Sequence, residues 1–231
     1  MSGPLVLHEV ELIIGGRQIL HPLSLTFAPG EVTAVSGPSG SGKTSLLTVA
    51  GGLLPPSRGT AEYDGRSTWQ GDGDPRPEVT FVLQVYGLVP ILSAHENVAI
   101  ALRARKIPAP EVQARALEAL DRFHIADLGD RQVEELSGGQ MQRVACARAF
   151  VVGAEVLLAD EPTSELDEFT RGQVMAELHR EAQRGAVVVV ATHDLAVVAA
   201  ADRHVVIDEG RLTDRVAPVA SAGRFRAGQS W

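Results

Sequence analysis

The sequence predicts an α/β fold with a parallel sheet at its centre, an antiparallel β-subdomain at the N-terminus and a helical insert. Short runs of β-branched residues recur along the chain, and segments with helical periodicity lie between them. Helix-opening patterns cluster between residues 85 and 152. Alternating strands and helices are typical of a doubly wound core. The 231 residues suit one domain, 1–231, with an insert at 85–152.

The first elements come before residue 55. The segment Leu5–Phe27 predicts a pair of antiparallel strands, with a turn at Gly15–Gly16. The run Val32–Ser36 has the length and composition of a strand that is buried on both faces. A helix is expected over Thr44–Leu53, because Gly51–Gly52 ends the helical pattern.

The stretch from 85 to 152 predicts three helices. Ser93 and Glu96 form a capping-box pattern that opens the first helix, which runs through Leu102. Two prolines open the second helix, which has four apolar residues on one face. These positions are Pro108 and Pro110, then Val112, Ala116, Leu120 and Phe123. A further Ser-x-x-Gln pattern opens the third helix at Ser137.

Four more runs predict the remaining strands of the parallel sheet. They are Val79–Leu83, Val156–Asp160, Val187–Ala191 and His204–Asp208. A helix is expected over Phe169–Arg184, with Val174 and Leu178 on one face. Two segments are expected to be flexible: Gly71–Pro77, which is rich in Gly, Asp and Pro, and the tail after Ala217.

The composition disfavours several classes of function. A formal net charge of -8 argues against a general nucleic-acid binder. Cys146 is the only cysteine, so no internal disulfide can form and a reducing compartment is favoured. The N-terminal residues show no signal-peptide pattern, and no apolar stretch has the length of a membrane span. If the protein works at a membrane, a partner must therefore bring it there.

A phosphate-binding loop is predicted between the run Val32–Ser36 and the helix that follows it. Its glycines let backbone N–H groups turn inward around a pyrophosphate, and the helix N-terminus adds its dipole. Lys43 can reach the β- and γ-phosphates, while Thr44 offers a hydroxyl to magnesium. The expected nucleotide-binding residues are Gly37, Pro38, Ser39, Gly40, Ser41, Gly42, Lys43, Thr44 and Ser45. The pattern predicts a P-loop NTPase core.

Two carboxylates follow the strand run that begins at Val156. Asp160 ends this run and Glu161 comes directly after it. A carboxylate at the C-terminal end of a parallel strand points into the crevice where such sheets bind ligands. We expect Asp160 to hold Mg²⁺, directly or through water. We expect Glu161 to orient the attacking water or accept its proton.

The string LSGGQ, from Leu136 to Gln140, separates one class of ATPase from other phosphate-loop proteins. Ser137 and Gln140 also fit an ordinary capping box at a helix N-terminus, and both interpretations can hold together. LSGGQMQR, combined with the phosphate loop and the Asp-Glu pair in this order, resembles the signature of ATP-binding-cassette (ABC) ATPases. The resemblance covers essentially the whole chain. It implies a helical insert that carries the signature, with ATP and Mg²⁺ as ligands.

The resemblance assigns roles to further residues. Gln84 matches the family's glutamine that contacts magnesium and the attacking water, in a loop that faces the membrane partner. His193 matches the switch histidine that touches the γ-phosphate. The string SELD, Ser164–Asp167, matches a loop that crosses a dimer interface. The family usually has a small residue where Glu165 stands.

The resemblance also implies a head-to-tail dimer that encloses two ATP molecules. The signature residues of one copy would reach the γ-phosphate that Lys43 of the other copy holds. Ser137 and Gly139 would make this contact, and Gly138 and Gln140 are expected to bind the nucleotide beside them. ATP would close the dimer and hydrolysis would reopen it, which drives a conformational change.

One departure from the family concerns the base of the nucleotide. The family usually places an aromatic residue near the N-terminus to stack on adenine. The corresponding position here is Ile14, or Ile13, and no aromatic residue precedes Phe27. We expect apolar contact to replace stacking, with weaker selectivity for the base.

Two strings, Val82–Val98 and Leu157–Asp167, resemble ATPases of the lipoprotein-releasing and macrolide-exporter group. The resemblance implies a transmembrane permease on a separate chain, a second ATPase copy, and a cytoplasmic location on the inner face of the cell membrane. The alternative function is an ATP-driven mechanical or regulatory module that acts on a membrane complex without transport. A soluble ABC protein of translation or DNA repair is disfavoured, because the chain has neither a second cassette nor long coiled coils.

Overall fold

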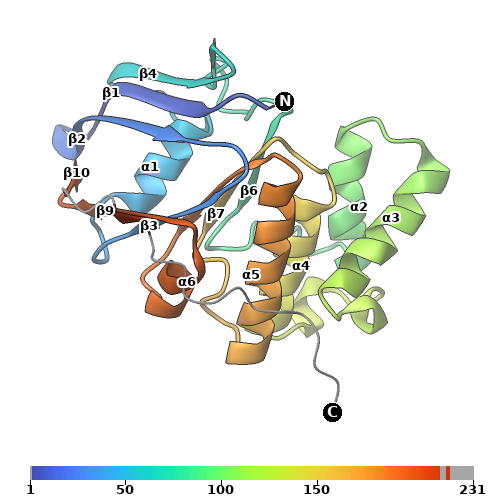
Figure 1. Ribbon diagram of the computed structural model, residues 1–231. Helices are drawn as coiled ribbons and strands as arrows, with labels where there is room; N and C mark the ends of the chain where they lie inside the picture. Colours follow the sequence, from blue (N-terminus) through green and yellow to red (C-terminus); the bar gives the residue numbers. More distant parts are fainter. Residues whose placement is uncertain (1, 214–216, 219–231) are drawn as a thin grey trace.

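The computed structural model describes residues 2–213 and 217–218, which form two sheets and a group of helices (Figure 1). The smaller sheet is antiparallel, with strand order β2-β1-β4-β5. Its strands are β1 (Leu5–Ile14), β2 (Arg17–Phe27), β4 (Arg58–Tyr63) and β5 (Arg66–Ser67). The predicted strand pair and its turn are therefore confirmed. The sheet also contains β4 and β5, which were not predicted from the sequence.

The larger sheet has strand order β10-β9-β3-β8-β7-β6, and β11 pairs with β9. Its strands are β3 (Val32–Ser36), β6 (Val79–Val82), β7 (Val156–Asp160), β8 (Val187–Ala191), β9 (Arg203–Asp208), β10 (Arg211–Leu212) and β11 (Ala217–Pro218). The five strands from β9 to β6 are parallel to their neighbours, whereas β10 and β11 run antiparallel to β9. The predicted parallel core is confirmed.

Alternate residues of the parallel strands enter two separate hydrophobic cores. In β8, Val187 and Val189 pack with α1 (Lys43–Ala50) and the antiparallel sheet, whereas Val188 packs on the other side of the sheet. Helix α1 lies between the two sheets and contacts both of them. The helices that pack on the other face of the large sheet include two from the C-terminal half of the chain. They are α5 (Glu168–Gln183) and α6 (Leu195–Ala200).

Three helices gather at one end of the molecule, away from the antiparallel sheet (Figure 1). They are α2 (Ala94–Ala104), α3 (Ala109–Arg122) and α4 (Gly138–Phe150), and two short 3₁₀ turns, Ala126–Leu128 and Val133–Glu135, lie between α3 and α4. The predicted capping boxes at Ser93 and Ser137 are both present. Arg122 of α3 forms ion pairs with Glu177 and Glu181, which are almost fully buried on α5. These pairs connect the helical group to the core.

Some predicted boundaries were wrong. Helix α1 ends at Ala50 and not at Leu53, because Gly51 caps it and Gly52 has a φ of 78°. The segment expected to be flexible near residue 75 contains Arg76, whose buried guanidinium donates to the carbonyl oxygens of Tyr63 and Arg66. The predicted flexible tail lies, from residue 219 onward, outside the described residues.

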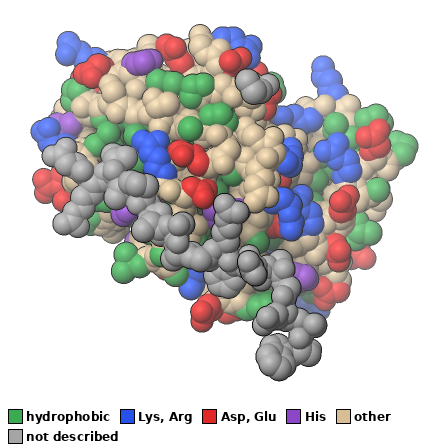
Figure 2. Space-filling model, viewed as in Figure 1, with side chains coloured by type: hydrophobic (Ala, Val, Ile, Leu, Met, Phe, Trp, Pro, Cys, Tyr) green, Lys and Arg blue, Asp and Glu red, His purple; other side chains and the backbone are tan. Residues whose placement is uncertain are grey.

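The described residues also bear on membrane insertion and thiol chemistry. Within residues 2–213 and 217–218, no helix combines the length and apolar character that crossing a membrane requires. Cys146 lies in α4 and is fully buried, and this burial raises the pKa of its thiol to about 12. Acidic and basic side chains are interspersed over much of the face that Figure 2 shows, and several basic side chains gather beside the helical group.

Phe123→Ala should lower the free energy of unfolding by about 3–5 kcal/mol, because it opens a cavity beneath α3. Phe123 is 1% exposed, and its ring meets that of Phe150 edge to face, with centroids 5.4 Å apart. Urea denaturation would measure the loss. Phe169→Ala is the matched control, since that side chain is 76% exposed and its removal should leave the transition nearly unchanged. Equal effects of the two substitutions would contradict this account of the core.

Candidate functional site

The loop between β3 and α1 wraps around the amine of Lys43. The Lys43 Nζ donates hydrogen bonds to the carbonyl oxygens of Gly37, at 2.8 Å, and Pro38, at 3.0 Å. The side chain is buried, whereas Thr44 beside it is exposed. A phosphate group in this loop would offer the amine charged acceptors in place of neutral carbonyls, and such hydrogen bonds are stronger.

Two glycines of this loop are needed for steric reasons. A Cβ atom at Gly37 would lie 1.9 Å from the carbonyl oxygen of Ile207 in β9, so no side chain fits there. Gly42 precedes α1 with a φ of 104° and would place a Cβ 2.9 Å from Leu20. The loop thus passes close to two strands before it enters the helix, whose N-terminus can bind an anion.

Thr44 and Asp160 meet across the loop. The Thr44 hydroxyl donates to Asp160 Oδ2 at 2.6 Å, which joins the start of α1 to the end of β7. Burial raises the pKa of the Asp160 carboxyl, as does the negative charge of Glu161, while the hydrogen bond from Thr44 and the charge of Lys43 lower it. A hydroxyl and a carboxylate side by side are ligands of the kind that Mg²⁺ prefers. The residues present therefore fit a magnesium ion beside the phosphate loop.

Glu161 lies at the centre of a second polar group. Its Oε1 accepts a hydrogen bond from the backbone N–H of His193, at 3.0 Å, and lies 2.6 Å from the His193 Nδ1. Its Oε2 accepts from the hydroxyl of Thr192 at 3.2 Å. Glu161 is buried, whereas 71% of the His193 side chain is exposed. The carboxylate is thus fixed in place, and the imidazole faces open space.

The backbone of Glu161 is in the left-handed region, with a φ of 49°. For a residue with a side chain this conformation costs about 1–2 kcal/mol. The N–H of Glu161 donates to the carbonyl oxygen of Ala191 at 2.9 Å, and with the side-chain hydrogen bonds this holds the residue in place. Strain of this kind is concentrated at functional sites in proteins.

Two further sequence-predicted residues have exposed side chains. Gln84 follows β6, which pairs with β7, so it emerges at the same edge of the sheet as Asp160. Among the described residues, the Gln84 side chain makes no hydrogen bond, and it is exposed. Ile14 ends β1 with 51% of its surface exposed, and Ile13 beside it is 44% exposed.

The signature residues lie at the N-terminus of α4, where Ser137 and Gln140 form the two hydrogen bonds of a capping box. The Ser137 N–H donates to Gln140 Oε1 at 2.8 Å, and the Ser137 hydroxyl accepts from the Gln140 N–H at 3.4 Å. A Cβ at Gly139 would lie 2.9 Å from the Glu165 carbonyl oxygen, and one at Gly138 would lie 3.4 Å from the Glu165 carboxylate. In one chain the signature therefore contacts the segment 164–167, and its described contacts do not include the phosphate loop.

Three residues near Glu161 were not predicted from the sequence: Thr192, Asp194 and Arg171. Arg171 and Asp194 form an ion pair, and both line a cavity of about 470 Å³ that also borders Glu161 and His193. Polar residues at the end of β8 were a signal for Thr192 and Asp194. Arg171 comes from α5, and nothing in its local sequence pointed to it.

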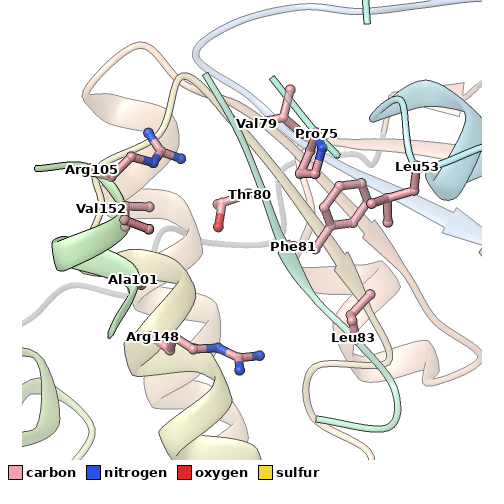
Figure 3. A pocket seen from close by; sticks show the side chains of 11 residues that line it. Leu53, Pro75, Val79, Thr80, Phe81, Leu83, Ala101, Arg105, Arg148 and Val152 are labelled. Carbon is pink, nitrogen blue, oxygen red and sulfur yellow. The ribbon is translucent and has the colours of Figure 1, made fainter. Parts of the chain in front are cut away.

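A second cavity, of about 320 Å³, lies between β6 and the helical group (Figure 3). Its floor is apolar and includes Phe81 and Leu83. The guanidinium groups of Arg105 and Arg148 lie at its edge. Arg148 donates to the carbonyl oxygens of Tyr86 and Gly87, which directly follow Gln84 and Val85.

A phosphate loop between a parallel strand and a helix, with two carboxylates at the end of the next strand but one, defines a P-loop nucleoside triphosphatase. The chain belongs to the ABC transporter family, whose sequence profile matches residues 20–164, more than half of the chain. This agrees with the resemblance of the signature string.

The relatives include an exporter and an importer. The chain is 39% identical over 221 residues to a macrolide export ATP-binding/permease protein, MacB, of Rhodopseudomonas palustris (strain BisB18), covering 91% of this chain and 34% of MacB. It is 38% identical over 218 residues to an Fe(3+) ions import ATP-binding protein, FbpC, of Agrobacterium fabrum, covering 94% of this chain and 62% of FbpC. The chain thus spans about a third of the length of MacB and less than two thirds of FbpC.

A solved structure matches nearly the whole fold. The dimeric structure of MJ0796, a bacterial ABC transporter cassette, superposes with a TM-score of 0.87 at 32% identity, covering 93% of this chain and 98% of that chain. The same cassette has been solved in a post-hydrolysis state bound to ADP and Pi, with a TM-score of 0.85. The chain therefore has the fold of an ABC ATPase cassette.

Proposed function

We propose that this chain is the ATP-hydrolysing subunit of an ABC transporter. It binds ATP and Mg²⁺ in a head-to-tail dimer and drives a conformational change in a transmembrane permease on a separate chain. The observation that carries this proposal is the pairing of Thr44 with Asp160 and of Glu161 with His193 beside one phosphate loop. The two pairs supply a metal site and a candidate base within one crevice.

The loop from Gly37 to Ser45 binds the phosphates of ATP through its N–H groups, and the Lys43 amine exchanges the Gly37 and Pro38 carbonyls for phosphate oxygens. Thr44, Asp160 and Gln84 would hold Mg²⁺, which neutralises charge on the transferring phosphoryl group. Glu161 orients the attacking water and accepts its proton, while its hydrogen bonds keep His193 near the γ-phosphate.

The signature completes the site from a second copy of the chain. Ser137, Gly138, Gly139 and Gln140 lie at the N-terminus of α4, where backbone N–H groups and the helix dipole favour an anion. In one copy Gly138 and Gly139 lie close to Glu165, and none of the atoms near them belongs to the phosphate loop. The signature residues of a partner copy would then approach the γ-phosphate that this copy's phosphate loop binds. The dimeric state of the similar cassette MJ0796 supports this arrangement.

The segment 85–152 is proposed to form a helical subdomain insert that carries the signature. The 320 Å³ cavity between this group and β6 is the proposed docking site for a cytoplasmic segment of the permease, adjoining the Gln84 loop. Its apolar floor suits an apolar segment, and Arg105 suits a carboxylate on that segment. The chain would then reside at the cytoplasmic face of the membrane through its partner.

Wild-type protein should bind ATP and GTP with comparable affinity, because Ile14 offers apolar contact without stacking or a directed hydrogen bond. Ile14→Tyr should tighten nucleotide binding about tenfold, since stacking of a base on an aromatic ring contributes roughly 1–3 kcal/mol. Titration of a fluorescent nucleotide, with ATP and GTP as competitors, would measure both effects. Ile13→Tyr is the matched comparison, because neighbouring residues of a strand point to opposite faces. A strong preference of the wild type for ATP would contradict the prediction.

The alternative function is an ATP-driven mechanical or regulatory module that acts on a membrane complex without transport. Its ATP site would be the same, so the partner decides between the two functions. We would express Glu161→Gln in the native cells, solubilise the membranes in detergent, purify the trapped ATP-bound form and identify the proteins that accompany it. A permease with a substrate pathway supports transport, and a membrane partner without one supports the alternative. Purification with soluble proteins alone, or with none, would overturn both.

A further inference from the structure

Helix α5 is joined to the loop that carries His193 by one ion pair. The Nε of Arg171, in the first turn of α5, lies 2.9 Å from Oδ2 of Asp194, and each side chain is 28% exposed. The Nε–H is not aligned for a hydrogen bond, so the contact is an attraction between charges. Within the part of the chain that the structure describes, no other ion pair connects α5 to the segment 192–195.

Asp194 is connected in turn to the catalytic candidates. Its Oδ1 accepts from the N–H of Ala196 at 2.8 Å and so caps α6. Its own N–H donates to the Thr192 hydroxyl at 3.0 Å, and that hydroxyl donates to Glu161. Asp194 therefore holds the C-terminal end of the 192–194 loop, and Thr192 at the other end of this loop binds Glu161.

The Arg171–Asp194 ion pair borders a cavity beside this loop. Its volume is about 470 Å³, and its lining includes Glu161, His193 and both members of the Arg171–Asp194 pair. Arg171 follows the segment 164–167 by four residues, and that segment contacts the signature. The Arg171–Asp194 pair thus joins the helix after the 164–167 segment to the loop of His193.

We propose that Arg171 is a positioning residue for ATP hydrolysis: its ion pair with Asp194 holds the 192–194 loop against α5 and so keeps His193 and Glu161 in their reactive arrangement. This inference rests on the proposed function, in which Glu161 and His193 act at the attacking water. Displacement of a catalytic group by about 1 Å can cost about a hundredfold in rate. Substrate binding by the phosphate loop does not depend on this pair.

The test uses two single variants and their combination. Arg171→Met removes the charge and keeps the length of the side chain, and Asp194→Asn removes the charge but retains a good helix cap. We expect each to lower kcat by about tenfold or more with the KM for ATP changed less than about threefold. The double variant should be no slower than the slower single, because both remove one interaction. Arg171→Lys should recover part of kcat.

The control is Arg180→Met, which removes an arginine from the same helix whose ion partner is Glu177, away from the cavity. It should leave kcat unchanged. An unchanged kcat in Arg171→Met, additive losses in the double variant, or a parallel fall of kcat and thermal stability in both Arg171→Met and Arg180→Met would each overturn the inference. These outcomes leave the proposed function intact if the wild type hydrolyses ATP, whereas an inactive wild-type protein would overturn the proposed function itself.

Discussion

Glu161→Gln should reduce ATP turnover by a factor of about 10²–10⁴ while ATP still binds. The glutamine amide has nearly the shape of the carboxylate, so the contact with the Thr192 hydroxyl can persist. The amide cannot accept a proton from water, however, so it cannot act as a base. The His193 Nδ1 lies 2.6 Å from Glu161 Oε1, and this contact would also weaken on loss of the charge. Phosphate release under saturating ATP would measure turnover, and size-exclusion chromatography with ATP would detect an accumulated dimer.

The matched control is Glu168→Gln, an exposed glutamate in the first turn of α5. This variant also removes one negative charge, at a position seven residues after Glu161, and it should leave turnover unchanged. Near-normal hydrolysis by Glu161→Gln would mean that another group accepts the proton. The assignment of Glu161 as the base would then be wrong, even if the phosphate loop still bound ATP.

Lys43→Ala should abolish detectable hydrolysis and weaken ATP binding by about 10–100-fold. The amine is the one cation that the loop encloses, and hydrogen bonds to charged groups contribute about 1.5–3 kcal/mol each. Its loss also removes the Lys43 hydrogen bond from the Gly37 carbonyl, whereas the Pro38 carbonyl keeps the hydrogen bond from the Ser41 N–H at 3.2 Å. Equilibrium titration with a slowly hydrolysed ATP analogue would measure the binding, and phosphate release would measure the rate.

The sequence contains a convenient control for this variant. Lys106 is the only other lysine, it is exposed, and it lies between α2 and α3. Lys106→Ala changes the net charge by the same amount, so a similar loss in both variants would point to a general effect of charge. Hydrolysis retained by Lys43→Ala would contradict the proposed role of the phosphate loop.

Features that depend on near neighbours in the sequence were predicted well. The capping boxes at Ser93 and Ser137 each need residues only three apart, and both formed as expected. The buried strands could be recognised as β-branched runs, because a strand that is covered on both faces consists almost entirely of apolar residues. The phosphate loop was also local, since its glycines and Lys43 lie within seven residues.

Features that depend on distant neighbours were not predicted. Strand β4 has only Ala61 and Tyr63 buried, so it lacks an apolar run, and its pairing with β1 decides its conformation. The positive φ of Glu161 is fixed by contacts with residues about thirty positions away. The Arg171–Asp194 pair likewise joins two elements whose separation in the chain gives no pattern to detect.

The solitary thiol of Cys146 makes this chain suited to site-directed spectroscopy. Thiol-reactive probes attack the thiolate, and a buried sulfur with a pKa of about 12 presents almost none of it at neutral pH. A cysteine introduced on the surface would therefore be the only site to accept a spin label or fluorophore. Distances between two labelled copies could then be followed through the nucleotide cycle without first replacing the native cysteine.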